Sequence, residues 1–171
     1  MLDFNVLENS KNNTITKKYY ENTVIGDPKA ILTVEFYGDS KEEIEVKANA
    51  LMDLLKEDKS VYAALKLDDM AKINDSLSLR KDGLGLIMNR PGLHKPLPFI
   101  EDAAIPLKHL PEYIKELIEL CRKYGSEVVL YAHASVGVLH VRPALDLSKA
   151  EDVIRLKEIS DQCFDLVVKY Q

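Results

Sequence analysis

The pattern of apolar and polar residues changes several times along the chain, and each change predicts a new element. Residues 1–29 are rich in asparagine, lysine and glutamate, which predicts a poorly ordered polar arm. From residue 30 onward the pattern is that of a folded domain reaching residue 171. Residues 30–37 and 60–67 are rich in β-branched and aromatic side chains, so both segments are expected to be strands.

Four further segments carry apolar residues at spacings of three and four, which is the pattern of an amphipathic helix. Serine or aspartate precedes three of them, as expected for helix caps, and proline lies in the first turn of the other. The expected starts are Ser40 with Glu43, Asp68 or Asp69, Pro111, and Ser148 with Glu151. The second helix is expected to end by Arg90-Pro91-Gly92, and a short extended segment follows at 96–102.

Two strands joined by a short turn are expected at 128–133 and 138–142. Strands and helices alternate along the rest of the chain, but strands joined so closely must be antiparallel. The predicted fold class is therefore α+β, with a mostly antiparallel sheet and helices packed on one face.

The hairpin carries the most informative polar residues. If its turn lies just before Gly137, His133 lies opposite His140 and Tyr131 lies opposite Arg142. Because side chains alternate along a strand, these four residues share one face of the sheet. The opposite face is apolar and carries Leu130, Ala132, Leu139 and Val141.

The composition of the chain argues against several classes of protein. The 171 residues include 23 basic and 28 acidic side chains, a net charge of −5, which argues against a nucleic-acid binder. A chain of this length builds a core without disulfides. Cys121 and Cys163 are therefore interpreted as small buried hydrophobic residues. Without a signal-peptide pattern or a long apolar run, the expected compartment is the cytoplasm.

Two imidazoles opposed across strands can bind one divalent ion, since their Cβ atoms lie about 5 Å apart. His133 and His140 are thus candidate metal ligands, although no third ligand is obvious nearby in the sequence. The alternative is that the two histidines form a hydrogen bond at the rim of the sheet. Glu101 and Asp102 are adjacent in an extended segment, so they are expected on opposite faces, with a capping or salt-bridge role.

Arg80 and Lys81 interrupt the apolar face of their helix, where another apolar residue is expected. A cation that faces inward suggests an anionic ligand or a buried carboxylate partner. The alternative is that the apolar stripe of the helix is rotated slightly, so that Arg80 and Lys81 both project into solvent. The sequence contains no glycine-rich cradle for a nucleotide cofactor. The residue types alone therefore predict a binding domain with a candidate two-histidine metal site.

Three passages resemble a known family. They are Leu79-Arg80-Lys81-Asp82-Gly83-Leu84-Gly85-Leu86, Pro98-Phe99-Ile100-Glu101-Asp102-Ala103-Ala104-Ile105-Pro106, and Tyr131 to Pro143 with its His-x-x-x-Gly-x-x-His spacing. They resemble the C-terminal, substrate-side domain of FAD-linked oxidases, a group that includes D-lactate dehydrogenase, the glycolate oxidase flavin subunit and D-2-hydroxyglutarate dehydrogenase. The resemblance covers about residues 30 to 171, and residues 134–143 most resemble long members fused to an iron–sulfur region.

The resemblance implies a ferredoxin-like cap domain, with FAD bound mainly by a domain absent from this chain. His133 and His140 match catalytic residues that hold a divalent metal such as zinc, with a glutamate expected downstream of Gln171. Arg80 matches the arginine that pairs with the substrate carboxylate. Lys81 and Arg142 are the further candidate substrate-binding cations. An iron–sulfur cluster is implied elsewhere in the full-length protein.

The leading hypothesis is the substrate and metal side of a flavin-dependent enzyme that oxidises a D-2-hydroxy acid, inactive as a fragment. The alternative is a free-standing α+β module that binds a ligand or metal for regulation. Expected partners are a small 2-hydroxy acid, the FAD domain of the same polypeptide and an electron acceptor, with no nucleic acid. A homodimer and a peripheral position at the inner membrane face are both compatible with the sequence.

Overall fold

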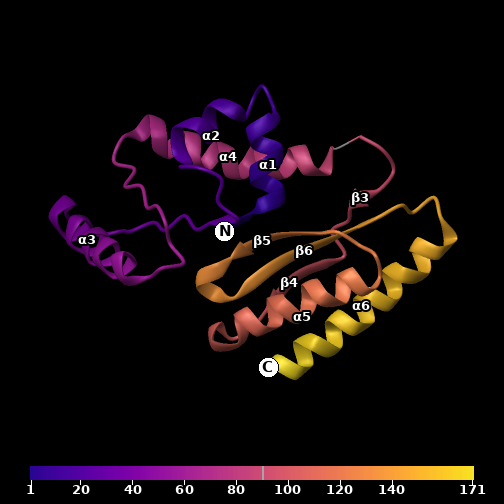
Figure 1. Ribbon diagram of the computed structural model, residues 1–171. Helices are drawn as coiled ribbons and strands as arrows, with labels where there is room; N and C mark the ends of the chain where they lie inside the picture. The colour runs from indigo at the N-terminus through magenta and orange to yellow at the C-terminus, as the bar shows by residue number, and fades with distance from the viewer. Residues whose placement is uncertain (90) are drawn as a thin grey trace.

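The computed structural model describes residues 1–89 and 91–171 as an α+β fold, which confirms the predicted class (Figure 1). The strands are β1 (Leu2–Asp3), β2 (Ala30–Ile31), β3 (Lys95–Pro96), β4 (Ile100–Ala104), β5 (Val128–His133) and β6 (Val138–Leu145). The helices are α1 (Phe4–Asn12), α2 (Lys17–Thr23), α3 (Lys41–Glu57), α4 (Met70–Met88), α5 (Leu110–Lys123) and α6 (Ala150–Tyr170). The strand order is β2-β1-β5-β6-β3, β4 also pairs with β6, and all pairs are antiparallel.

Helices α5 and α6 cover one face of the sheet (Figure 1). The apolar side of the β5–β6 hairpin faces them, as the alternation of residues predicts: Leu130, Ala132, Leu139 and Val141 are all buried. Leu117 of α5 and Ile159 of α6 are fully buried against this face. Each such side chain contributes about 1.5–3 kcal/mol when removed from water. The hairpin is therefore anchored to α5 and α6 through its apolar face.

The opposite face is covered by residues that the sequence predicted to be poorly ordered. Residues 2–23 instead form β1, which pairs with β5, and the helices α1 and α2, which pack against α4. Val6 and Leu7 are buried with Leu79 and Val129. Asp3 caps α1 through the Val6 amide and also accepts a hydrogen bond from the Leu130 amide. The prediction of a disordered arm was wrong because its few apolar residues share one helix face, while its many asparagines are mostly exposed.

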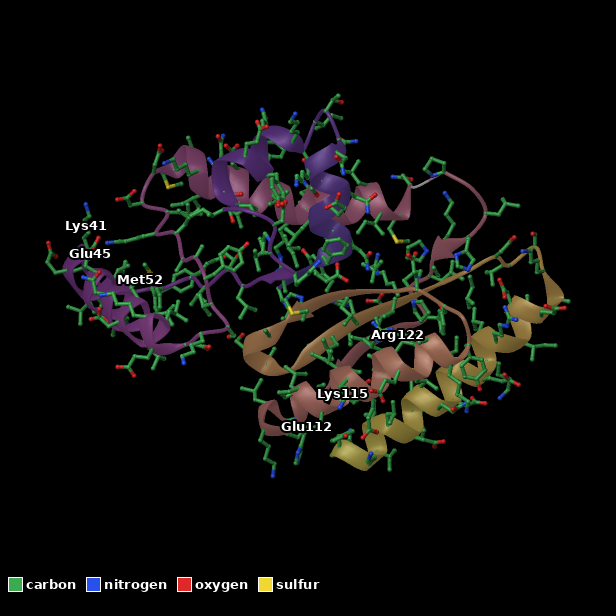
Figure 2. All side chains as sticks on the ribbon, viewed as in Figure 1. Lys41, Glu45, Met52, Glu112, Lys115 and Arg122 are labelled. Atoms are coloured by element: carbon green, nitrogen blue, oxygen red, sulfur yellow. The ribbon has the colours of Figure 1, made fainter. Side chains whose placement is uncertain are left out.

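Helix α3 lies apart from the sheet, beyond the two extended segments that connect it to the chain (Figure 1). Its side chains, including the labelled Lys41, Glu45 and Met52, surround a helix that buries no residue (Figure 2). Apart from Ala30 and Ile31, the residues of the strands predicted at 30–37 and 60–67 are not strands. A strand needs a partner for its backbone groups, and these segments have none in the sheet.

The remaining helices agree with the sequence pattern, except at the start of α6. Asp69 caps α4 as expected, but Ser148 does not cap α6, because its hydroxyl donates to Asp146 instead. Helix α4 ends at Met88, and Arg90 of the expected terminating turn lies outside the described residues. Within the described part of the chain, every helix is too short or too polar to cross a bilayer.

The hairpin is formed as predicted, but its register is shifted by two residues. Tyr131 pairs with His140, and His133 pairs with Val138, because Ala134–Val136 form a 3-10 turn that ends at Gly137. Gly137 has a φ of 68°, in the left-handed region. A shift of one residue would exchange the two faces of a strand, whereas a shift of two preserves them. The predicted polar face is therefore retained.

Candidate functional site

Four polar residues gather on the sheet face opposite α5 and α6. Tyr131 and His133 of β5 and His140 and Arg142 of β6 share this face, as the alternation of side chains requires. The rings of Tyr131 and His140 have centroids 6.0 Å apart. Towards α4 this face is apolar, and towards the turn of the hairpin it becomes polar and more accessible.

The two histidines lie close together, although they are not directly opposed. Because the register is shifted, His133 and His140 are diagonal neighbours, with ring centroids 5.4 Å apart and planes at 71°. His133 is exposed, and the His140 side chain is 20% exposed. Two imidazoles at this separation are within reach of a shared ligand.

Glu101 and Asp102 both approach His140, which the sequence analysis did not foresee. His140 Nδ1 lies 2.5 Å from Glu101 Oε2 and 3.4 Å from Asp102 Oδ1. The expectation of opposite faces was wrong, because the register with β6 shifts between Ile100 and Ala103 and Asp102 has a φ of 58°. This irregularity breaks the alternation of side chains along β4. The pattern of apolar residues contains no signal for it.

Arg142 is held by the same carboxylate. Its Nε donates a 3.0 Å hydrogen bond to Glu101 Oε1, and its side chain is 16% exposed. This ion pair confirms the salt-bridge role predicted for Glu101. The charge of Arg142 is therefore partly neutralised before any ligand arrives.

Arg80 projects from α4 onto the polar face. Its guanidinium carbon lies 4.4 Å from the centroid of the Tyr131 ring, and the Tyr131 hydroxyl donates to the Arg80 carbonyl oxygen at 3.3 Å. Burial raises the pKa of Tyr131, and the neighbouring Arg80 charge opposes this rise. Of the described carboxylates, none forms an ion pair with Arg80. Lys81, the next residue, is exposed.

Together these contacts link most of the residues that the sequence singled out. Arg80 stacks on Tyr131, Tyr131 contacts His140, and His140 contacts His133 and Glu101. Of the candidate cations, Arg80 and Arg142 lie on this face, whereas the Lys81 side chain is exposed. The arrangement combines a stacked guanidinium for an anion with imidazoles for a metal ion or a proton.

The donor set fits a divalent metal ion that accepts nitrogen and oxygen ligands. The ligand atoms of Glu101, Asp102 and His140 all lie within 4.8 Å of one another. His133 is not a member of this group, but its ring centroid lies 5.4 Å from that of His140. The sequence suggested no third ligand at close range, whereas the fold brings two carboxylates to the site. A zinc ion or a similar divalent ion is compatible with these groups.

The sequence of this chain matches the model of one protein family over residues 4–171. The family is described as FAD linked oxidases, C-terminal domain. The chain belongs to this family. The resemblance inferred from the Arg80, Glu101 and hairpin passages is thereby confirmed, and the match also includes most of the N-terminal residues that pack on the second sheet face.

Curated relatives carry the names of hydroxy-acid dehydrogenases. The chain is 37% identical over 142 residues to the D-2-hydroxyglutarate dehydrogenases of Haemophilus influenzae and Escherichia coli, which covers 80% of this chain and 14% of each relative. It is 28% identical over 118 residues to a D-lactate dehydrogenase of Archaeoglobus fulgidus, covering 69% of this chain and 23% of that protein. The chain thus spans about a seventh of the length of the first two relatives.

Proposed function

We propose that this chain is the substrate- and metal-side domain of a flavin-dependent dehydrogenase that oxidises a D-2-hydroxy acid. The observation that carries the proposal is Arg80, a half-buried cation stacked on Tyr131, in a chain of the FAD-linked oxidase family. The Tyr131 ring in turn contacts His140, which lies next to His133. The family name implies FAD. The proposed substrate class includes 2-hydroxyglutarate, lactate and glycolate, and the names of the relatives favour D-2-hydroxyglutarate for the first test.

The proposed chemistry divides between the carboxylate and the hydroxyl of the substrate. Oxidation of a 2-hydroxy acid to a 2-oxo acid removes a proton from the hydroxyl and a hydride from C2. Arg80 binds the carboxylate through two parallel hydrogen bonds, and Tyr131 holds the guanidinium plane in position. Fixing the carboxylate orients the C2 hydrogen, which lowers the entropic part of the barrier.

His133 and His140 are proposed to act at the hydroxyl. Each would hold a divalent ion beside it through one ring nitrogen. A neutral imidazole has a single lone pair, so only a ring that holds no ion can instead accept the hydroxyl proton. When bound, FAD supplies the hydride acceptor, and the ion supplies the Lewis acidity that lowers the pKa of the hydroxyl. Arg142 and Lys81 are the proposed cations for the second carboxylate of a dicarboxylic substrate. FAD, an electron acceptor and a further metal ligand are proposed to come from outside this chain.

The proposal is tested by turnover in the polypeptide that contains this chain together with its flavin-binding domain. Reduction of a dye by D-2-hydroxyglutarate, D-lactate and glycolate identifies the substrate. Arg80→Ala is expected to lower kcat/KM about 10- to 100-fold, since a hydrogen bond to a charged group contributes about 1.5–3 kcal/mol. Stopped-flow measurement of flavin reduction locates the loss in the reductive half-reaction.

Arg122→Ala is the matched control. Arg122 is exposed on α5, on the far side of the sheet from the site, as Figure 2 shows. Its variant should retain the parent kcat/KM. The proposal fails if Arg80→Ala and Arg122→Ala are equally active. A polypeptide that carries no flavin and instead binds a carboxylate or metal effector would favour a regulatory module.

A further inference from the structure

Glu101 makes two hydrogen bonds at once, one with each oxygen of its carboxylate. Oε2 lies 2.5 Å from His140 Nδ1, and Oε1 lies 3.0 Å from Arg142 Nε. The Glu101 side chain is 27% exposed and its two partners are less exposed, so water competes weakly for these bonds. A carboxylate held between two donors has little rotational freedom.

The bond to Glu101 determines which ring nitrogen of His140 carries the proton. An ionised carboxylate accepts hydrogen bonds but cannot donate them, so His140 Nδ1 must be the donor. In the neutral ring this leaves the lone pair on Nε2. Asp102 Oδ1, 3.4 Å from the same Nδ1, adds a negative charge that favours the same tautomer, although Asp102 is far more exposed.

We infer that Glu101 is a positioning residue that fixes the tautomer and the ring orientation of His140, so that Nε2 is presented to a metal ion or to the substrate hydroxyl. This inference rests on the proposed role of His140. A carboxylate behind a metal-bound histidine orients the ring and makes its free nitrogen more basic, and its loss typically weakens metal binding about 10- to 100-fold.

The alternative is that Glu101 itself coordinates the ion together with Asp102 and His140 Nδ1. The contacts of Glu101 favour the positioning role, since both of its oxygens already accept hydrogen bonds. Direct coordination would also place a cation beside the Arg142 guanidinium and would require Nδ1 to give up its proton. Both changes carry an electrostatic cost that coordination through Nε2 avoids.

Glu101→Gln is a sharp test because an amide cannot serve both partners. Its one oxygen can accept from His140 or from Arg142, and its NH₂ group then faces the other donor. If the oxygen remains with Arg142, the NH₂ group meets Nδ1 and favours the opposite tautomer. Glu119→Gln, an exposed residue of α5, is the matched control. Circular dichroism checks that each variant is folded.

The first readout is the tautomer of His140 in the metal-free chain, measured by long-range ¹H–¹⁵N NMR at mildly alkaline pH. His140→Asn identifies its signals. We expect the Nδ1–H form in the parent chain and in Glu119→Gln, and a population of the Nε2–H form in Glu101→Gln. A parent chain in which His140 carries its proton on Nε2 overturns the inference, whatever its metal affinity.

The second readout is zinc affinity, measured by calorimetry. We expect Glu101→Gln to bind zinc about 10- to 100-fold more weakly than the parent and Glu119→Gln to be unchanged. Loss of all binding in Glu101→Gln, as in His140→Ala, with His140 coordinated through Nδ1 in the parent, would make Glu101 a ligand and contradict the inference. A parent chain that binds no zinc removes the metal from the proposed function, while the tautomer measurement still decides the role of Glu101.

Discussion

Asp102 shows how one backbone dihedral angle changes the chemistry available at a strand. With ordinary extended geometry, Glu101 and Asp102 would point to opposite faces of β4. The positive φ of Asp102 and the irregular pairing with β6 bring both carboxylates to His140. Non-glycine residues adopt such a φ at a cost of about 1–2 kcal/mol, and here the conformation lies at the candidate site.

Gly137 is the second residue whose conformation determines the shape of the site. Its carbonyl accepts a hydrogen bond from the Ile105 amide, and an added Cβ would lie 1.9 Å from the Ile105 carbonyl oxygen. Gly137→Ala should lower the free energy of unfolding by roughly 2–4 kcal/mol, through strain at positive φ and displacement of the backbone. Urea denaturation measures the loss.

Gly125 provides the control for this prediction. It has the same φ of 68°, but a Cβ there would meet no atom within 4 Å. Gly125→Ala therefore reports the cost of the dihedral angle alone, about 1 kcal/mol. Equal losses in the two variants would show that the contact with Ile105 is unimportant.

The two cysteines link the stability of the core to pH. Burial raises the pKa of Cys121 to about 11 and that of Cys163 to about 12, from an ordinary value of 9.0. In the unfolded chain the thiols ionise near the ordinary value, so above it the folded state binds more protons. Stability is therefore fully present below pH 9 and is lost as pH rises towards the folded values.

Urea denaturation at several pH values checks this expectation against the double variant Cys121→Ala, Cys163→Ala. The variant should be less stable throughout, because two buried side chains are shortened. Its free energy of unfolding should nevertheless fall less steeply above pH 9. Parallel curves for the two proteins would mean that the thiols do not contribute to the pH dependence.

At the level of elements, α4 connects the N-terminal helices to the site. Leu79, Gly83 and Ile87 lie four residues apart and form the buried stripe of the helix, while Arg80 is turned towards the sheet. Gly83 allows α1 to approach closely, so it serves a packing role in a helix that continues to Met88. The backbone that carries Arg80 is therefore positioned by packing.

Substitution of two glycines in α4 separates packing from helix propensity. A Cβ at Gly83 would lie 2.8 Å from Ser10 Oγ and 2.9 Å from Val6 Cγ1, whereas one at Gly85 would meet no atom within 4 Å. Gly85→Ala should stabilise the protein by up to about 1 kcal/mol. Gly83→Ala should instead destabilise it by about 1–2 kcal/mol, because Val6 is stiff and buried. Thermal unfolding compares the two variants. If Gly83→Ala stabilised the protein as Gly85→Ala does, the close contact between α1 and α4 at Gly83 would be contradicted.

The whole molecule consists of a sheet covered on both faces and a helix, α3, that contributes little to either core. Helices α5 and α6 pack on one face of the hairpin, and α1, α2 and α4 lie on the other. Helix α3 buries no side chain, and several apolar residues around it are exposed, among them Leu32, Val34, Leu54 and Tyr62. Stability is therefore distributed unevenly.

A pair of leucine truncations tests this distribution. Leu117→Ala removes a fully buried side chain from the α5–α6 core and should lower the free energy of unfolding by about 2–5 kcal/mol. Leu51→Ala changes a half-buried position on α3 and should cost less than about 1 kcal/mol. Urea denaturation measures both, and comparable losses would place α3 within the cooperative core.

Local periodicity along the chain was sufficient to predict one group of features. The spacing of apolar residues located α3 to α6, and alternation along β5 and β6 separated an apolar face from a face with Tyr131, His133, His140 and Arg142. Three motif passages identified the family, which the match over residues 4–171 confirmed. These features follow from the geometry of single elements, so they need no knowledge of the partners.

A second group of features depends on pairing between distant segments and is visible only in the folded molecule. The tertiary structure set the register of the hairpin, turned Glu101 and Asp102 towards His140, and packed α1 and α2 on the second face of the sheet. The segments at 32–37 and 60–67 have strand-like composition but no partner in the sheet. Register, irregular pairing and packing are properties of two segments together, so the pattern within either one does not contain them.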